Sequence, residues 1–209
     1  MTTNPDTIQD FELLHQINEG NMKVYEQIIR RYNPLLYKIG RSYSFNHQDT
    51  EDLMQETYID VYRGLAKFEN RSSFKTWISR IMLNQCYHKR QAVIIKKEIT
   101  EDELLFSKSD NGNSESKLSN TELSRVLETA INEIPENYRI VFALRELNGL
   151  NVAETAHTLD ISENNVKVRF NRAKALLREK ITRTYSSEEL FEFNCIYCDG
   201  MVSKVMSDI

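Results

Sequence analysis

Apolar residues recur three and four positions apart along most of the chain, which is the spacing of helices that bury one face. The pattern is clearest at residues 11–17, 24–39 and 123–134. Only six Gly and three Pro occur among 209 residues, which is too few turn formers for a β meander, and helix-forming residues fill most segments. We therefore predict an all-α fold.

Residues 49–68, DTEDLMQETYIDVYRGLAKF, form a predicted helix with two contrasting faces. Asp49 or Thr50 is expected to cap its start. The expected buried stripe comprises Met54, Thr57, Tyr58, Val61, Tyr62 and Leu65. The opposite face carries Asp52, Gln55, Glu56, Ile59 and Arg63. Solubility does not need an isoleucine among polar side chains, so this face is either a partner surface or a solvated face with one stray apolar residue.

The segment FENRSSFKTWISRIMLN, residues 68–84, interleaves bases with aromatic rings. Ser72 or Ser73 can cap a helix whose core side carries Phe74, Trp77, Ile78, Ile81 and Gln85. One flank of that helix carries Thr76, Arg80, Asn84, Tyr87 and Gln91. Cations, amides and a ring in one line can contact phosphates, base edges and unstacked bases. The loop before the helix is short and polar and contains a ring, so it can close over an extruded base.

The chain is predicted to divide into two small helical domains. Residues 98–120 lose the apolar periodicity and fill with Ser, Asn, Asp and Glu, which is the composition of a flexible linker. We place the domains at residues 1–97 and 121–183, with a tail at residues 184–209.

The second domain is predicted to contain a helix-turn-helix. Pro135 is expected to stop one helix and to be the first residue of the next, which ends at Gly149. The sequence that follows, NVAETAHTLDISENNVKVRFNRAKALLREKI, predicts a short helix with Val152, Ala153 and Ala156 inward, a turn, and a second helix capped by Ser162. Val166, Phe170, Ala173 and Leu177 are expected to face the core.

The outward positions of this second helix suit duplex DNA. They are Asn164, Asn165, Lys167, Val168, Asn171, Arg172 and Lys174. They lie near the N-terminal turns that enter a major groove, where amides suit adenine and Arg or Lys suit guanine or phosphate. A generic helical hairpin with a basic face is the plainer alternative.

Charge is distributed very unevenly. The formal net charge is -4, yet residues 61–97 hold nine bases against one acid, and residues 164–183 hold seven against one. Two basic patches on an acidic body can attract phosphates by local potential, although two solvated helix faces have the same pattern.

Several functional classes receive no support from the sequence. The longest apolar run, IVFAL at residues 140–144, is far shorter than the roughly 20 residues of a membrane span, and the acidic N-terminus is unlike a secretory signal. We expect a cytoplasmic protein without membrane insertion. Three cysteines argue against a disulfide framework. We find no carboxylate cluster with metal spacing, no Gly-rich phosphate loop and no nucleophile beside a base, so no enzyme, metal or cofactor is expected.

Two stretches together resemble one known family. EDLMQETYIDVYRGLAKFENRSSFKTWISRIMLNQC and LRELNGLNVAETAHTLDISENNVKVRFNRAKALLREKI are similar to the extracytoplasmic-function class of bacterial sigma factors, the exchangeable promoter-recognition subunits of RNA polymerase. The resemblance covers about residues 10–183. It implies that the first domain binds core polymerase and recognises and melts the minus-ten element, and that the second reads the minus-thirty-five element.

The resemblance also implies roles for individual residues. The clamp helices of the largest polymerase subunit would contact Asp52, Gln55, Glu56, Ile59 and Arg63. The non-template strand of the minus-ten element would contact Phe68, Asn70, Arg71, Arg80, Asn84 and Tyr87. The minus-thirty-five element would contact Asn164, Asn165, Lys167, Asn171, Arg172 and Lys174. The polymerase flap region is a further expected partner, and the family often uses an inhibitory anti-sigma protein.

The tail and two rival functions remain open from the sequence. Cys195 and Cys198 form a C-x-x-C, but zinc normally needs four ligands and no second pair or nearby His supplies them. Packing of the tail on the second domain and a redox switch are the two interpretations.

A stand-alone helix-turn-helix regulator is the main rival function, and it leaves FENRSSFKTW unexplained. A nucleic-acid enzyme is the other.

Overall fold

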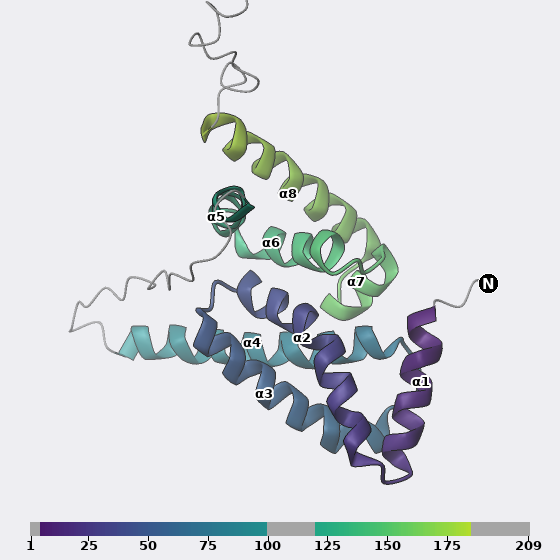
Figure 1. The fold of residues 1–209 in the computed structure, drawn as a ribbon. Helices are drawn as coiled ribbons and strands as arrows, with labels where there is room; N and C mark the ends of the chain where they lie inside the picture. Colours follow the sequence, from purple (N-terminus) through teal and green to yellow (C-terminus); the bar gives the residue numbers. More distant parts are fainter. Residues whose placement is uncertain (1–4, 100–119, 185–209) are drawn as a thin grey trace, which may run out of the picture.

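The computed structural model describes residues 5–99 and 120–184, and every regular element in those ranges is helical (Figure 1). The first half contains α1 (Pro5–Asn18), α2 (Tyr25–Ser42), α3 (His47–Gly64) and α4 (Phe74–Ile99). The second half contains α5 (Asn120–Asn132), α6 (Glu136–Phe142), α7 (Val152–Leu159) and α8 (Glu163–Thr184). The short turns η1 (Met22–Val24), η2 (Leu65–Lys67) and the π-helical η3 (Ala143–Leu147) extend or connect them. The predicted all-α fold is confirmed.

The core of the first half forms where α2, α3 and α4 pack together, with α1 against α2. Ile28, Leu36, Ile78 and Met82 are completely buried there. Burial of each such side chain is worth about 1.5–3 kcal/mol. Helices α2 and α3 approach closely at Gly40, where an added Cβ would lie 2.6 Å from the Thr50 Cγ2 atom. Only glycine fits this crossing.

One serine cap and one asparagine cap mark where α4 and α3 begin. Ser73 Oγ accepts the backbone N–H of Thr76 at 3.2 Å, so Ser73 caps α4 as predicted. The cap of α3 is Asn46 rather than Asp49 or Thr50, because Asn46 Oδ1 accepts the backbone N–H of Asp49 at 2.8 Å. Asp49 instead pairs with Lys89 of α4 at 2.6 Å.

Three predicted burial assignments are wrong. Tyr62 is 40% exposed because it packs edge-on to Tyr25 at the surface, and Leu53, which the pattern did not single out, is buried in the core instead. Thr76 is buried because its hydroxyl turns inward to the Ser73 hydroxyl, at 2.8 Å. Ala153 is exposed because the inner side of α7 consists of Thr155 and Ala156.

The second half is built around the contact between α6 and α8. Pro135 is the N-cap of α6, one residue before the helix rather than its first residue. Helix α7 starts with a reciprocal cap, in which Asn151 and Glu154 each accept the other's backbone N–H at 2.8–2.9 Å. The chain turns at Asp160, whose φ is 53°, and Ser162 Oγ accepts the backbone N–H of Asn165 at 3.2 Å. The predicted helix-turn-helix and its serine cap are confirmed.

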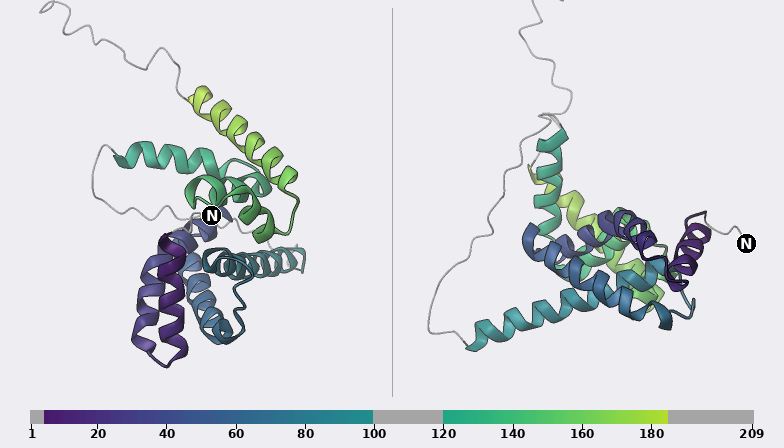
Figure 2. Two further views of the ribbon diagram at one scale, coloured as in Figure 1. Left: turned by 90° about the vertical axis from the view of Figure 1, so that its right-hand side faces the viewer. Right: turned by 60° about the horizontal axis from the view of Figure 1, so that its bottom comes forward.

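The two halves share a packed interface, visible where α6 and α7 lie along α2 and α4 (Figures 1 and 2). Ile140, Leu144 and Leu150 of the second half join the core cluster of the first. Two lysines of the first half also reach across. Lys38 Nζ donates to the Leu147 carbonyl at 2.8 Å, and Lys75 Nζ donates to the Asn148 carbonyl at 2.5 Å.

A buried guanidinium completes this interface. Arg139 is 5% exposed, and burial lowers its pKa from the ordinary value. Its Nε donates to the Ser42 carbonyl of α2 at 2.5 Å, and its NH1 group donates to the Asn132 and Ile134 carbonyls at 2.6 and 3.2 Å. Arg139 therefore ties the end of α2 to the turn between α5 and α6.

None of the helices in residues 5–99 and 120–184 combines the length and the apolar character that crossing a bilayer requires.

We predict that Arg139→Met lowers the free energy of unfolding by about 2–3 kcal/mol, because methionine keeps the stem but removes the charged donors. Urea denaturation followed by circular dichroism measures this change. The matched control is Arg30→Met, because Arg30 is exposed and pairs only one turn away with Glu26. That variant should lose no more than about 0.5 kcal/mol. Equal losses in the two variants would contradict the role of Arg139.

A second prediction concerns Cys86, which is completely buried on α4. Burial raises the pKa of its thiol from 9.0 to about 12. Thiolate is the reactive form, so iodoacetamide at pH 8 should label Cys86 only after unfolding. The unfolded chain loses this proton near pH 9 and the native chain keeps it, so the free energy of unfolding should fall as pH rises from about 9 towards 12.

The labelling is measured in a Cys195→Ser, Cys198→Ser background, which leaves Cys86 as the remaining thiol of the sequence. A Cys86→Ala variant of that background should show a weaker decline of stability above pH 9. Labelling of the native protein as fast as that of the unfolded chain would refute the burial of this thiol.

Candidate nucleic-acid interface

The outward face of α3 is an exposed surface of mixed polarity. All five residues predicted for it are exposed, and they recur three and four positions apart: Asp52, Gln55, Glu56, Ile59 and Arg63. Ile59 is 42% exposed. The side chains of Gln85 and Lys89 on α4 pair with Asp60 and Asp49 at 2.5 and 2.6 Å, which fixes α3 on α4. The structure thus brings the predicted partner surface together on one rigid helix.

This surface has an apolar extension that sequence reasoning missed. Tyr62 was assigned to the core, but its ring packs edge-on to Tyr25 with centroids 5.3 Å apart. Its hydroxyl donates to the sulfur of Met22 at 2.8 Å. Met22 is itself 53% exposed. An exposed Met beside an exposed Tyr was not detectable from periodicity, because Met22 lies in a short turn far away in the sequence.

On α4, three predicted contact residues form one exposed row. Arg80, Asn84 and Tyr87 are four and three positions apart and all exposed, with Tyr87 at 56%. Within the described ranges, no hydrogen bond or ion pair joins the side chain of Arg80 or Asn84 to another residue. Their donors and acceptors are therefore available to an external partner.

The loop that precedes α4 rests on an aromatic cluster. Phe68 is half-buried, and its ring centroid lies 4.9 Å from that of Trp77 and 5.6 Å from that of Phe74. Asn70 is exposed in the left-handed region at φ 54°. Arg71 is exposed and pairs with Glu69 at 2.5 Å, an interaction of small energy in solvent. Phe68 therefore anchors the loop on the aromatic cluster, while Asn70 and Arg71 remain accessible to solvent.

The loop borders a hollow that also involves α1. A cavity of about 510 Å³ is lined by Asp10, Phe11, Leu14, Phe68, Asn70, Ser72, Ser73 and Phe74. The sequence pattern gave α1 only a core role. Asp10 is 5% exposed and accepts hydrogen bonds from Arg31 NH1 at 2.7 Å and from the Tyr32 hydroxyl at 2.5 Å. Neither α1 nor this cluster was part of the predicted site.

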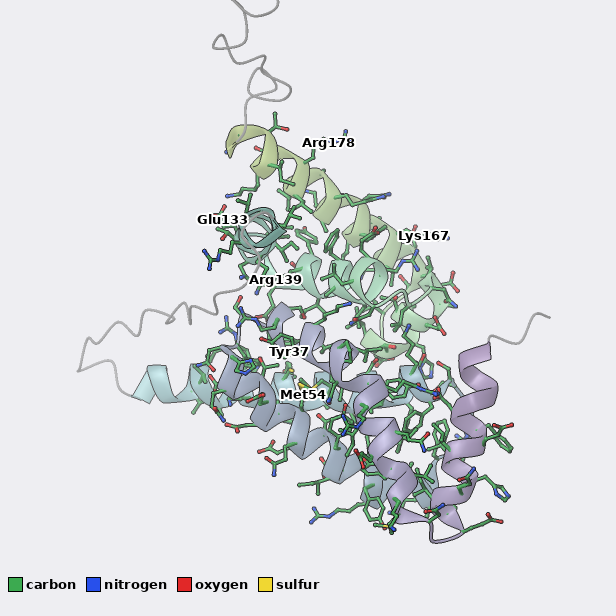
Figure 3. All side chains as sticks on the ribbon, viewed as in Figure 1. Tyr37, Met54, Glu133, Arg139, Lys167 and Arg178 are labelled. Atoms are coloured by element: carbon green, nitrogen blue, oxygen red, sulfur yellow. The ribbon has the colours of Figure 1, made fainter. Side chains whose placement is uncertain are left out.

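On α8, the predicted contact residues lie on the outer side of the second half. Asn164, Lys167, Asn171, Arg172 and Lys174 are exposed, and Asn165 is half-buried behind the Ser162 cap. Lys167 and Arg178 both lie on the outer side of α8 (Figure 3). Lys174 Nζ lies 4.5 Å above the Phe170 ring, so its position is partly fixed by a cation–π contact. Exposed Val168 lies among these residues.

Side chains that commonly bind metal ions are scattered in the part of the chain that the structure covers. No group of three or more His, Cys, Asp or Glu side chains gathers there in a geometry that would hold a metal ion. Cys195 and Cys198, with the tail in which the sequence leaves a redox switch open, lie outside the described residues.

Two family models match this chain, one in each half. A family model described as Sigma-70 region 2 matches residues 28–92, and one described as Sigma-70, region 4 matches residues 124–177. The first match contains α3, the loop and the row on α4, and the second contains the helix-turn-helix.

Curated relatives match almost end to end. An ECF RNA polymerase sigma-E factor from Haemophilus influenzae is 26% identical over 187 residues, which are 84% of this chain and 97% of that protein. The sigma-E factor from Escherichia coli K12 is also 26% identical, over 186 residues, 84% of this chain and 96% of that protein.

Two solved structures share the fold. One is described as CnrH in complex with the cytosolic domain of CnrY, with a TM-score of 0.62, 24% identity, and coverage of 83% of this chain and 97% of that one. The other is the sigma factor RpoE in complex with the anti-sigma factor NepR from Bartonella quintana, with a TM-score of 0.65, 21% identity, and coverage of 77% and 98%.

Proposed function

The chain belongs to the extracytoplasmic-function class of the sigma-70 family, the promoter-recognition subunits of bacterial RNA polymerase, and we propose how its surfaces divide that task. The first half docks on core polymerase and opens the minus-ten element. The second half grips the minus-thirty-five element. The observation that carries this proposal is the row of Arg80, Asn84 and Tyr87, which is exposed beside a polar loop.

We propose that the outward face of α3 binds the clamp helices of the largest polymerase subunit. Ile59 supports this role. Its side chain is 42% exposed among polar groups, and covering it with a partner would remove apolar surface from water and so stabilise the complex. Asp52, Gln55, Glu56 and Arg63 surround it and supply a polar rim. The second half, α5–α8, contacts the flap region.

The row on α4 and the adjacent loop capture the non-template strand. Arg80 and Arg71 supply charge for phosphates, Asn84 supplies an amide for base edges, and Tyr87 supplies a ring for an unstacked base. Extrusion of a base costs a few kcal/mol, which stacking and polar contacts in the loop offset. Phe68 and Asn70 form the loop that receives it.

Helix α8 enters the major groove with its N-terminal turns. Asn164, Asn165 and Asn171 contact base edges, while Lys167, Arg172 and Lys174 contact guanine or phosphate. The helix-turn-helix alone would also suit a stand-alone regulator, but the region 2 match in the first half does not favour that alternative.

The protein directs the polymerase and catalyses no step itself, and its site of action is the cytoplasm. Residues 1–97 and 121–183 serve as the two functional units, with residues 98–120 as a linker and residues 184–209 as a tail.

An anti-sigma protein is a further proposed partner. Both similar solved structures hold a sigma factor or its relative with a second protein, named in one case as an anti-sigma factor. Because the two halves of this chain pack together, such an inhibitor could bind both of them at once.

The central test combines purified core polymerase with this protein on a matched promoter. Wild type should confer specific transcription, and Asn84→Ala should bind core equally well but open the minus-ten element poorly, because it loses an amide that contacts bases and no core contact. Permanganate footprinting measures opening, and co-purification measures core binding.

The matched control is Gln27→Ala, which removes an exposed amide from α2. This variant should open the promoter as wild type does. If Asn84→Ala opened it equally well, the proposed role of α4 would be wrong, and if wild type failed to direct core at all, the proposed function would be wrong.

A separate prediction distinguishes phosphate contacts from base contacts on α8. Lys167→Ala should weaken binding to all duplexes alike and reduce the slope of log K against log salt by about 1. Asn171→Ala should relax preference at one base pair, at a cost of about 1–3 kcal/mol for the preferred sequence. Fluorescence anisotropy over a salt series measures both effects.

Lys23→Ala serves as the control, because Lys23 is exposed in the turn before α2. It should leave the salt dependence unchanged. A slope altered equally by Lys23→Ala and Lys167→Ala would show that α8 makes no specific phosphate contact.

A further inference from the structure

Helix α1 carries an exposed aromatic ring that the proposed function does not yet use. Phe11 is 58% exposed, although its neighbours Leu13 and Leu14 are buried. The ring lines the 510 Å³ hollow beside the loop. It also lines a smaller hollow of about 90 Å³, which shares Leu14, Phe68 and Asn70 with the larger one. The two hollows therefore adjoin between α1 and the loop, and together they are called the groove.

The backbone that carries Phe11 is held in place by neighbouring residues of α1. The preceding residue, Asp10, is buried and bound to both Arg31 and Tyr32 of α2. Leu13, Leu14 and Ile17 anchor the same helix in the core, each 6–7% exposed. Because the backbone at Phe11 is anchored, binding of a ligand has to order only the two side-chain torsions of this ring.

The opposite wall of the groove is also fixed and is partly aromatic. Phe68 packs on Phe74 and Trp77, which holds its ring in place. Ser72 and Ser73 add polar groups to the lining. Exposed Arg71 lies between the lining residues Asn70 and Ser72 in the sequence and is paired with exposed Glu69, so a phosphate can compete for its guanidinium. A suitable occupant has flat apolar faces, a polar edge and an anionic backbone, and an unpaired nucleotide has all three.

We propose that Phe11 is a second wall of the base-capture site: an unstacked nucleobase of the non-template strand enters the groove and stacks against the Phe11 ring. This inference rests on the proposed function and extends it to a helix outside the row on α4. A protein segment in the groove is the competing occupant, and the experiment below separates the two.

The test places a photocrosslinker at Phe11 in the full chain, as Phe11→p-benzoylphenylalanine, and assembles it with core polymerase on an opened promoter. We expect a crosslink to one nucleotide of the non-template strand. The same crosslinker at Tyr87 reports on the row on α4, and at exposed Gln16, on the far flank of α1, it serves as the negative control.

The outcomes are distinguishable. A DNA crosslink from Tyr87 without one from Phe11, or a Phe11 crosslink to polymerase alone, overturns the inference and leaves the proposed function intact. Absence of any DNA crosslink from Tyr87, together with no promoter opening by wild type, overturns the proposed function.

Substitutions give an independent measure of stacking. Phe11→Ala should reduce the equilibrium constant for promoter opening by about 5- to 150-fold, the range expected when one base loses one aromatic partner. Phe11→Trp should restore it. Both variants should melt at the wild-type temperature because the ring is mostly exposed. Equal opening by wild type and Phe11→Ala, or loss in Phe11→Ala that Phe11→Trp does not restore, would overturn the stacking role.

Discussion

The arrangement of the two halves depends on how one buried cation is satisfied. Among residues 5–99 and 120–184, no carboxylate lies within hydrogen-bonding distance of Arg139, and its guanidinium instead donates to three backbone carbonyls. Backbone carbonyls at helix ends lack intrahelical donors, so the guanidinium and the helix ends satisfy each other. Because one of these carbonyls belongs to Ser42 and the others to the α5–α6 turn, the same group that completes the second half also joins it to the first. The apolar contacts of Ile140, Leu144 and Leu150 then form around that junction.

Much of the fold was predictable because it follows from local rules. The helical spacing identified the principal helices of both halves, and the serine caps at Ser73 and Ser162 were identified from the residue type alone. The assignments that failed depend on tertiary context. Tyr62 has the spacing of a core residue but packs against Tyr25 at the surface and stays 40% exposed. The cap of α3 is Asn46 because the helix begins at His47, earlier than the pattern indicated, and Asp49 lies inside its first turn, where it pairs with Lys89.

The candidate site was predictable to a similar degree and for similar reasons. Exposure of Arg80, Asn84 and Tyr87 follows from one helix and its period, so sequence spacing was sufficient to group them. The groove beside the loop needs α1 and residues 68–74 to be adjacent, which no local pattern encodes. The contact between the two halves was likewise invisible, since Lys38 and Lys75 bind backbone atoms, and backbone atoms carry no sequence signal.

Lys38 and Lys75 come from different helices, yet they hold the carbonyls of two consecutive residues, Leu147 and Asn148. Both attachments therefore sit almost at one point. Sliding the second half across the first stretches the two bonds together, whereas turning it about residues 147–148 changes either length very little. The two lysine bonds therefore allow rotation about residues 147–148 more readily than translation, and the buried contacts of Ile140, Leu144 and Leu150 are what oppose that rotation.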